Sequence, residues 1–197
     1  MIFKQETQIL KCTFEKEHFS KVKAAFKDRW PVVYIIEDDE KGQAYIGEST
    51  NICTRICDHW NNTERRALKN IYIIFNKVFN KSVILDLEAF LIGYIVADGK
   101  YRLQNGNGGQ HVHNYYLRDE YQREFRHIWQ LLQDEGVVRH GITLLENQDL
   151  FKYSPYKILN LDQFNVAVQI LTDLKYDLGN NNQSRSFIID GGAGTGK

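Results

Sequence analysis

Runs and alternations of apolar residues predict four strands in the first half of the chain. Residues 32–36 are β-branched or aromatic throughout, which is typical of a buried strand. Residues 44–46 form a second short strand after a polar stretch, so the two together predict a β-hairpin. Residues 71–77 are largely apolar at both alternating positions and predict a strand buried on both faces. Another short strand is predicted at 8–12.

Helical spacing of apolar residues predicts four helices in the first 135 residues. They span residues 15–27, 51–60, 83–97 and 115–135. Thr50 or Asn51 can cap the second helix and Ser82 the third, and Gly136 ends the fourth.

The pattern then changes and indicates a second unit. Residues 136–160 lack clear periodicity and contain a Ser-Pro step, which is typical of a linker between domains. Helical spacing returns over 161–174, and 187–189 form a short apolar strand. We therefore expect one domain at 1–135, a linker at 136–160 and the start of another domain at 161–197.

Composition and charge limit the possible classes of protein. The chain has 197 residues, is 43% hydrophobic and 13% aromatic, and is therefore not a disordered tail. Its 25 basic residues equal its 25 acidic residues, so any contact with nucleic acid must be local. The longest uncharged apolar stretch, 89–97, is far shorter than the roughly 20 residues of a membrane-spanning helix. With three cysteines and no secretory signal, we expect a cytoplasmic protein without membrane contact.

The last seven residues match the phosphate-binding loop pattern of a glycine, four residues and Gly-Lys. The match comprises Gly191, Gly194, Gly196 and Lys197, after a short apolar segment. In such loops backbone N–H groups surround the phosphates and the lysine reaches the β- and γ-phosphates. With Gln163 as a possible adenine contact, the segment resembles the start of a superfamily 1 helicase-like P-loop ATPase.

A complete nucleotide site needs more than this segment. The Ser or Thr that holds magnesium in such loops would be residue 198, and the second acidic motif would come later still. We therefore expect the chain to be the N-terminal fragment of a larger protein, with its own C-terminal ATPase domain as a partner. ATP would bind only in that intact, longer protein.

A second set of candidate site residues lies within the first domain. Val32-Val33-Tyr34 is followed by Tyr45-Ile46-Gly47, and then by Arg55 and His59 on the next predicted helix. This order resembles the GIY-YIG nucleases over roughly residues 30–110, with Val32 in place of the first glycine. The resemblance implies one catalytic site built from two strand tyrosines, a helical arginine, a histidine one turn later, and a glutamate on a later helix. A late asparagine completes the set.

The resemblance assigns these roles to Tyr34, Tyr45, Arg55, His59, Glu88 and Asn105. A single carboxylate with waters and a substrate phosphate is a sufficient set of ligands for Mg²⁺, so Glu88 would hold Mg²⁺ or Mn²⁺. The planar, permanent cation of Arg55 suits phosphate oxygens in the transition state. Either Tyr34 or His59 would take the proton from water, and Tyr45 would orient the water or the phosphate. Asn105 would orient the phosphate or a metal-bound water, and Asn107 competes with it for that role.

Ordinary interpretations exist for each of these residues alone. Strand tyrosines usually pack, and a helical arginine, glutamate or histidine is usually a surface or core residue. Cys53, Cys57 and His59 could suggest zinc, but no second Cys or His pair has the spacing of a structural zinc site. The order and spacing of the whole set favour the nuclease site.

We therefore expect an α+β fold, in which a small, mainly antiparallel β-sheet is flanked by helices, followed by the first helix and strand of a P-loop α/β domain. The expected function is a metal-dependent endonuclease that hydrolyses DNA phosphodiester bonds, and the partner is DNA or possibly another nucleic acid. The alternative is a module that binds nucleic acid or regulates the ATPase without cutting. The basic residues Arg65, Arg66 and Lys69 could contact the phosphates of the nucleic acid.

Overall fold

A computed structural model describes residues 7–106 and 114–148, together with six isolated positions after residue 165. The predicted ATPase segment, with Gly191, Gly194, Gly196 and Lys197, lies outside the described residues apart from those positions. Asn107 also lies outside them. The following description therefore concerns the first unit.

The described residues form one five-stranded mixed sheet with the strand order β1-β4-β2-β3-β5. The strands are β1 (Gln8–Thr13), β2 (Val32–Asp38), β3 (Gln43–Ser49), β4 (Asn70–Phe75) and β5 (Arg102–Leu103). The pairs β1·β4, β4·β2 and β2·β3 are antiparallel, whereas the two-residue β5 runs parallel to β3. The sheet is therefore mainly antiparallel, as expected from the sequence, and β5 leaves most of the outer edge of β3 without a neighbouring strand.

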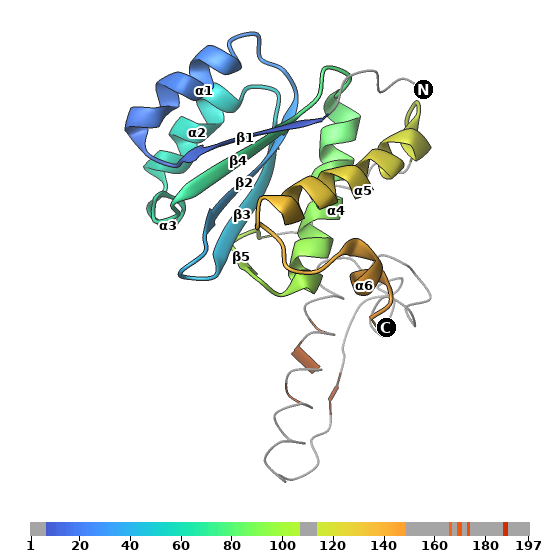
Figure 1. Cartoon of the computed structure of the whole chain (residues 1–197). Helices are drawn as coiled ribbons and strands as arrows, with labels where there is room; N and C mark the ends of the chain where they lie inside the picture. Colours follow the sequence, from blue (N-terminus) through green and yellow to red (C-terminus); the bar gives the residue numbers. More distant parts are fainter. Residues whose placement is uncertain are drawn as a thin grey trace.

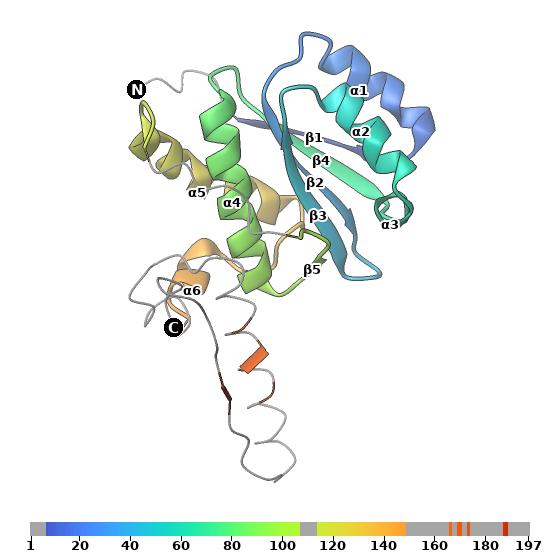
Figure 2. The ribbon, with the colours of Figure 1, turned by 180° about the vertical axis from the view of Figure 1, so that it is seen from behind.

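The helices cover both faces of this sheet (Figures 1 and 2). They are η1 (Lys16–His18), α1 (Phe19–Ala25), α2 (Ile52–Asn61), α3 (Thr63–Arg66), α4 (Lys81–Asp98), α5 (Arg118–Asp134) and α6 (Ile142–Glu146). Helices α1 and α2 lie on one face, and α4 and α5 lie on the other. None of the described helices is both long and apolar enough to cross a membrane.

Polar caps fix where the two helices that carry site residues begin. Asn51 precedes α2, and its side chain accepts a hydrogen bond from the backbone N–H of Thr54. Asn80 does the same for α4 through Val83, so the prediction that Ser82 caps this helix is wrong. Helix α4 begins at Lys81, and this start places Ser82 within its first turn.

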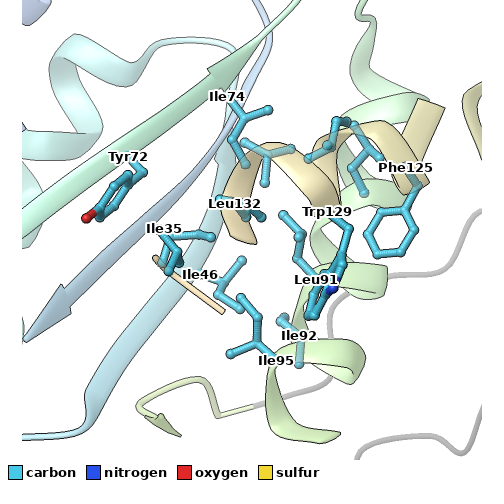
Figure 3. Packing of buried hydrophobic residues seen from close by; sticks show 14 of the residues in the cluster. Ile35, Ile46, Tyr72, Ile74, Leu91, Ile92, Ile95, Phe125, Trp129 and Leu132 are labelled. Atoms are coloured by element: carbon cyan, nitrogen blue, oxygen red, sulfur yellow. The ribbon is translucent and has the colours of Figure 1, made fainter. Parts of the chain in front are cut away.

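Each face of the sheet has its own hydrophobic core because side chains of successive strand residues point to opposite sides. On one face, Val33, Ile35 and Ile46 pack against α4 and α5 (Figure 3). On the other face, Tyr34 and Ile36 pack against α1 and α2. Strand β2 is buried along its whole length, since it lies between two strands and under both helical layers.

The segment after α5 packs onto the first core. Gly136, with a φ of +72°, ends α5, and Val137, Val138 and Leu145 are buried against that helix layer. The first part of the predicted linker therefore adds to the packing of the domain.

Candidate active site

Tyr34 lies at the centre of β2, directly opposite Gly47 on β3. It is completely buried, and its ring passes across the backbone of Gly47. A Cβ at position 47 would lie 2.3 Å from the Tyr34 hydroxyl oxygen, a distance that real atoms do not reach. Because residue 47 has no side chain, the Tyr34 ring and hydroxyl can lie against the backbone of β3.

Tyr45 lies on the same face of the sheet, two residues before Gly47. Its ring is 6.3 Å from the ring of Tyr34 and 8% of the residue is exposed. Val32, which departs from the family pattern, is fully buried on this face and packs in the core beneath α1 and α2. Valine at this position therefore has a packing role.

Helix α2 brings His59 onto the two tyrosines. Its Nε2 lies 2.8 Å from the Tyr34 hydroxyl oxygen, and its ring is 4.8 Å from the ring of Tyr45. The residue is completely buried although imidazole is polar. The three aromatic side chains therefore form one contiguous group between the sheet and the helix.

Arg55 lies one helical turn before His59 and flanks the same group. Its guanidinium interacts through side-chain hydrogen bonds with Tyr34 and Tyr45, which raise the pKa of Arg55. Burial raises the pKa of Tyr34 far above its usual value, and the charge of Arg55 opposes this shift. Arg55 thus places a permanent positive charge beside the Tyr34 hydroxyl, but burial still outweighs its effect on the pKa of Tyr34.

His59 is held in its neutral form. Burial, followed by the charges of Arg65 and Arg55, lowers its pKa to about 3. Arg65, on the short helix α3, contacts the ring directly, with its Nη1 3.0 Å from Nδ1 of His59. Its guanidinium carbon also lies 4.0 Å from the centre of the Tyr45 ring, which is a cation–π contact.

Glu88 reaches this region from the opposite face of the sheet. It lies on α4 and is partly buried, close enough to the backbone N–H and the carboxylate of Glu48 on β3 for both to affect its pKa. Burial, then the charge of Glu48, raises the pKa of Glu88 to about 7, while Lys81 and Arg55 oppose the shift. The open edge of β3 therefore holds Glu88 within electrostatic reach of Arg55.

Glu48 is a second carboxylate at this edge. Lys81 forms an ion pair with one of its oxygens, while the other oxygen, Oε2, is buried without a hydrogen-bond partner. The sequence reasoning did not identify Glu48. Its position directly after the Tyr45-Ile46-Gly47 triad, on the strand that carries the site, was the available signal.

Asn105 binds the same edge of β3 one step further along. Its side chain accepts a hydrogen bond from the backbone N–H of Ile46 and donates one to the carbonyl oxygen of Ile46, at 3.0 and 2.8 Å. Asn105 thus supplies hydrogen-bond partners for the backbone of β3 at the point where β5 has ended. The geometry gives Asn105 a role in fixing this strand.

The basic residues after α2 have different surroundings. Arg65 is turned inward onto Tyr45 and His59, and Lys69 pairs with Glu40 and Asp38. Only Arg66 of these three has an exposed side chain with no ion pair among the described residues. Cys53 and Cys57 are free thiols, and the described residues contain no group of three His, Cys, Asp or Glu side chains that could hold a metal.

Four of the six predicted residues thus meet on one face, Glu88 joins them at the edge of β3, and Asn105 fixes that edge. The arrangement combines a permanent cation, a hydroxyl group between Arg55 and a neutral imidazole, and a partly buried carboxylate with a raised pKa. Such a set can bind a phosphate, transfer a proton and hold a divalent cation.

Comparison with known proteins gives one match. Residues 31–101 match the family described as the GIY-YIG catalytic domain, and this range includes Tyr34, Tyr45, Arg55, His59 and Glu88. No curated protein and no solved structure matches the chain significantly. A GIY-YIG catalytic domain implies an endonuclease, and therefore a nucleic-acid substrate.

Proposed function

Starting from the GIY-YIG catalytic domain at residues 31–101, we propose that this protein is a divalent-metal-dependent endonuclease that hydrolyses DNA phosphodiester bonds. The observation that carries the proposal is the arrangement around the Tyr34 hydroxyl. His59 and Arg55 interact with it, while Glu88 lies close enough to affect the pKa of Tyr34. A buried structural tyrosine needs one hydrogen-bond partner for its hydroxyl, whereas this hydroxyl has both a neutral imidazole and a permanent cation beside it.

Glu88 is the residue that would hold Mg²⁺ or Mn²⁺. Burial, followed by the charge of Glu48, raises the pKa of Glu88, and one oxygen of Glu48 is itself buried without a hydrogen-bond partner. A divalent cation relieves the repulsion between two neighbouring carboxylates, so the residues present fit such an ion. When bound, the cation would neutralise phosphate charge and acidify a water molecule.

The other residues divide the remaining chemistry. Arg55 would bind the phosphate oxygens and stabilise their growing charge, since its fork matches phosphate geometry. An oxygen–phosphorus bond forms from water as the bond from phosphorus to the leaving sugar oxygen breaks. Tyr34 or His59 would take the proton from the attacking water, and Tyr45 would orient the water or the phosphate.

A groove lies at the start of β3, although none of the six candidate residues lines it. Its volume is about 360 Å³, and it is lined by Gln43, Glu64, Ala67, Arg102, Leu103 and Gln104. Gln43 is the first residue of β3, two positions before Tyr45, so the groove lies along the same strand. The exposed Arg102 would supply a phosphate contact to a nucleic-acid strand in this groove.

We also propose that the nuclease is the N-terminal part of a longer protein with an ATPase or helicase domain. The phosphate-binding loop pattern at Gly191, Gly194, Gly196 and Lys197 supports this proposal. ATP would then bind the complete C-terminal domain, and its hydrolysis would move the DNA relative to the nuclease.

The test is cleavage of supercoiled plasmid by the 197-residue chain with Mg²⁺, with Mn²⁺ and with a chelator, beside Arg55→Ala and Glu88→Ala. We expect cleavage that needs the metal and is lost in both variants. Arg123→Ala is the matched control for Arg55→Ala, because Arg123 is also exposed but lies on α5, on the other face of the sheet. DNA binding without cleavage in either metal would contradict the proposal and favour a module that only binds nucleic acid.

A further inference from the structure

Arg65 lies on an element that exists only because the chain turns sharply after α2. Asn62 ends α2 and caps α3, since its side chain accepts hydrogen bonds from the backbone N–H groups of Glu64 and Arg65. This turn brings the Arg65 side chain back over Tyr45 and to within 3.0 Å of His59 Nδ1. One guanidinium is thereby fixed between the two rings by a stacking contact and a hydrogen bond.

The hydrogen-bonding capacity of these groups determines the tautomer of His59. A guanidinium has donors and no acceptor, so Nδ1 of His59 must accept the hydrogen bond from Arg65. A neutral imidazole has one N–H group, which must then be on Nε2. Since Nε2 lies 2.8 Å from the Tyr34 hydroxyl oxygen, His59 donates this hydrogen bond and Tyr34 accepts it.

The charged and titratable groups around the imidazole favour the same state. Arg55 faces it from its own helix, Tyr34 from β2, Tyr45 from β3 and Arg65 from α3. Two of these groups, Arg55 and Arg65, are permanent cations. A second proton on the ring would therefore be repelled from two sides.

We propose that Arg65 is a positioning residue that fixes His59 in the Nε2–H tautomer, so that His59 donates a hydrogen bond to the Tyr34 oxygen and does not itself take a proton from water. The catalytic part rests on the proposed nuclease function. With Nδ1 bound to Arg65 and Nε2 carrying hydrogen, His59 has no lone pair available for a proton. Its role is to donate a hydrogen bond to the Tyr34 oxygen.

The proton balance follows from this assignment. Arg55 and the Nε2–H group of His59 both interact with the Tyr34 oxygen. As the water oxygen bonds to phosphorus, the bond from phosphorus to the leaving sugar oxygen breaks, and the proton released by the water goes to a group other than His59. His59 keeps its single proton throughout.

The tautomer can be measured directly by long-range ¹H–¹⁵N NMR of the chain labelled at its histidines, with His59 assigned by loss of its signals in His59→Gln. We expect a neutral Nε2–H ring in the wild type at pH 7. In Arg65→Met, which keeps a long apolar side chain over Tyr45 but no donor, we expect a mixture of both tautomers. Arg65→Lys keeps a donor and should restore the wild-type pattern. Arg66→Met, at the neighbouring exposed position, should leave it unchanged.

Cleavage assays give the catalytic readout. Arg65→Met should lower kcat about 10- to 100-fold, as is typical when the partner that orients a functional imidazole is removed, with little change in KM. The pH dependence of its cleavage should also change, and Arg65→Lys should recover part of the rate.

The two sets of measurements separate the possible failures. A wild-type ring protonated at Nδ1, or at both nitrogens at pH 7, would overturn the proposal even if Arg65→Met did not fold. An unchanged tautomer and pH profile in folded Arg65→Met would also overturn it. If the wild type showed the Nε2–H tautomer but cut no DNA, the nuclease function would fail and the structural role of Arg65 would stand.

Discussion

Replacing Gly47 with alanine perturbs the path of the Tyr34 hydroxyl by a single methyl group. The added carbon would lie 2.3 Å from the hydroxyl oxygen and 2.5 Å from the ring carbon that bears it. Ordinary contact begins at 3.4 Å, so the hydroxyl must retreat by about 1 Å. Tyr34 is completely buried, and the ring therefore cannot move into solvent.

Both the stability and the activity of the Gly47→Ala protein should fall. Forcing an extra methyl group into a packed interior costs about 1–3 kcal/mol, which corresponds to a decrease in Tm of roughly 2–12 °C for a domain of this size. A retreat of about 1 Å also breaks the 2.8 Å hydrogen bond to His59 and misplaces the hydroxyl. Misplacement on this scale costs about 100-fold in rate.

The assays are thermal unfolding followed by circular dichroism and plasmid cleavage under single-turnover conditions. Gly93→Ala is the matched control, because a Cβ at that position in α4 meets no atom within 4 Å. Alanine is the better helix former, so this control should be as stable as the wild type or more stable by up to about 1 kcal/mol. Wild-type cleavage by a folded Gly47→Ala protein would refute the role assigned to the Tyr34 hydroxyl.

The charge of Glu88 and the amide of Asn105 give two further predictions. The raised pKa of Glu88 stabilises the metal-free fold below about pH 4.5, and this contribution is lost as the pH rises through about 7. In unfolding scans, Glu88→Gln should therefore gain Tm relative to the wild type between pH 5 and pH 8, and Mg²⁺ should raise only the wild-type Tm. A constant difference in Tm would contradict this. Asn105→Ala leaves both backbone groups of Ile46 at an open edge, and should cost about 1–3 kcal/mol of stability and speed amide exchange at Ile46. Unchanged exchange there would mean that Asn105 does not hold the strand.

Much of the fold follows from local patterns in the sequence. The hairpin of β2 and β3 and the strand β4 were predictable because apolar runs of that length, bounded by polar turns, favour strands. Elements too short to show a period were not predictable. Helix α3 has only four residues and depends on the cap at Asn62, and β5 has two residues that pair with the distant strand β3. The cap of α4 was misplaced because Asn80 and Ser82 are both good caps.

The site was predictable where its residues share one motif and not where they meet across the fold. Tyr34, Tyr45, Arg55 and His59 lie on adjacent elements with regular spacing. The contact of Arg65 with His59 depends on the turn at Asn62, and sequence reasoning suggested a phosphate contact for this arginine. Glu48 and Glu88 lie near each other because α4 crosses the edge of β3. No local pattern in the sequence reveals this crossing.

The most direct test of the account is the rate of metal-dependent plasmid cleavage by Tyr34→Phe beside the wild type. This change removes one oxygen atom, the atom with which His59 and Arg55 both interact, and leaves the buried ring in place. The account predicts a folded protein, shown by circular dichroism, whose cleavage is at least about 100-fold slower. Cleavage at the wild-type rate would contradict the central claim that the Tyr34 hydroxyl is the reacting centre of the site.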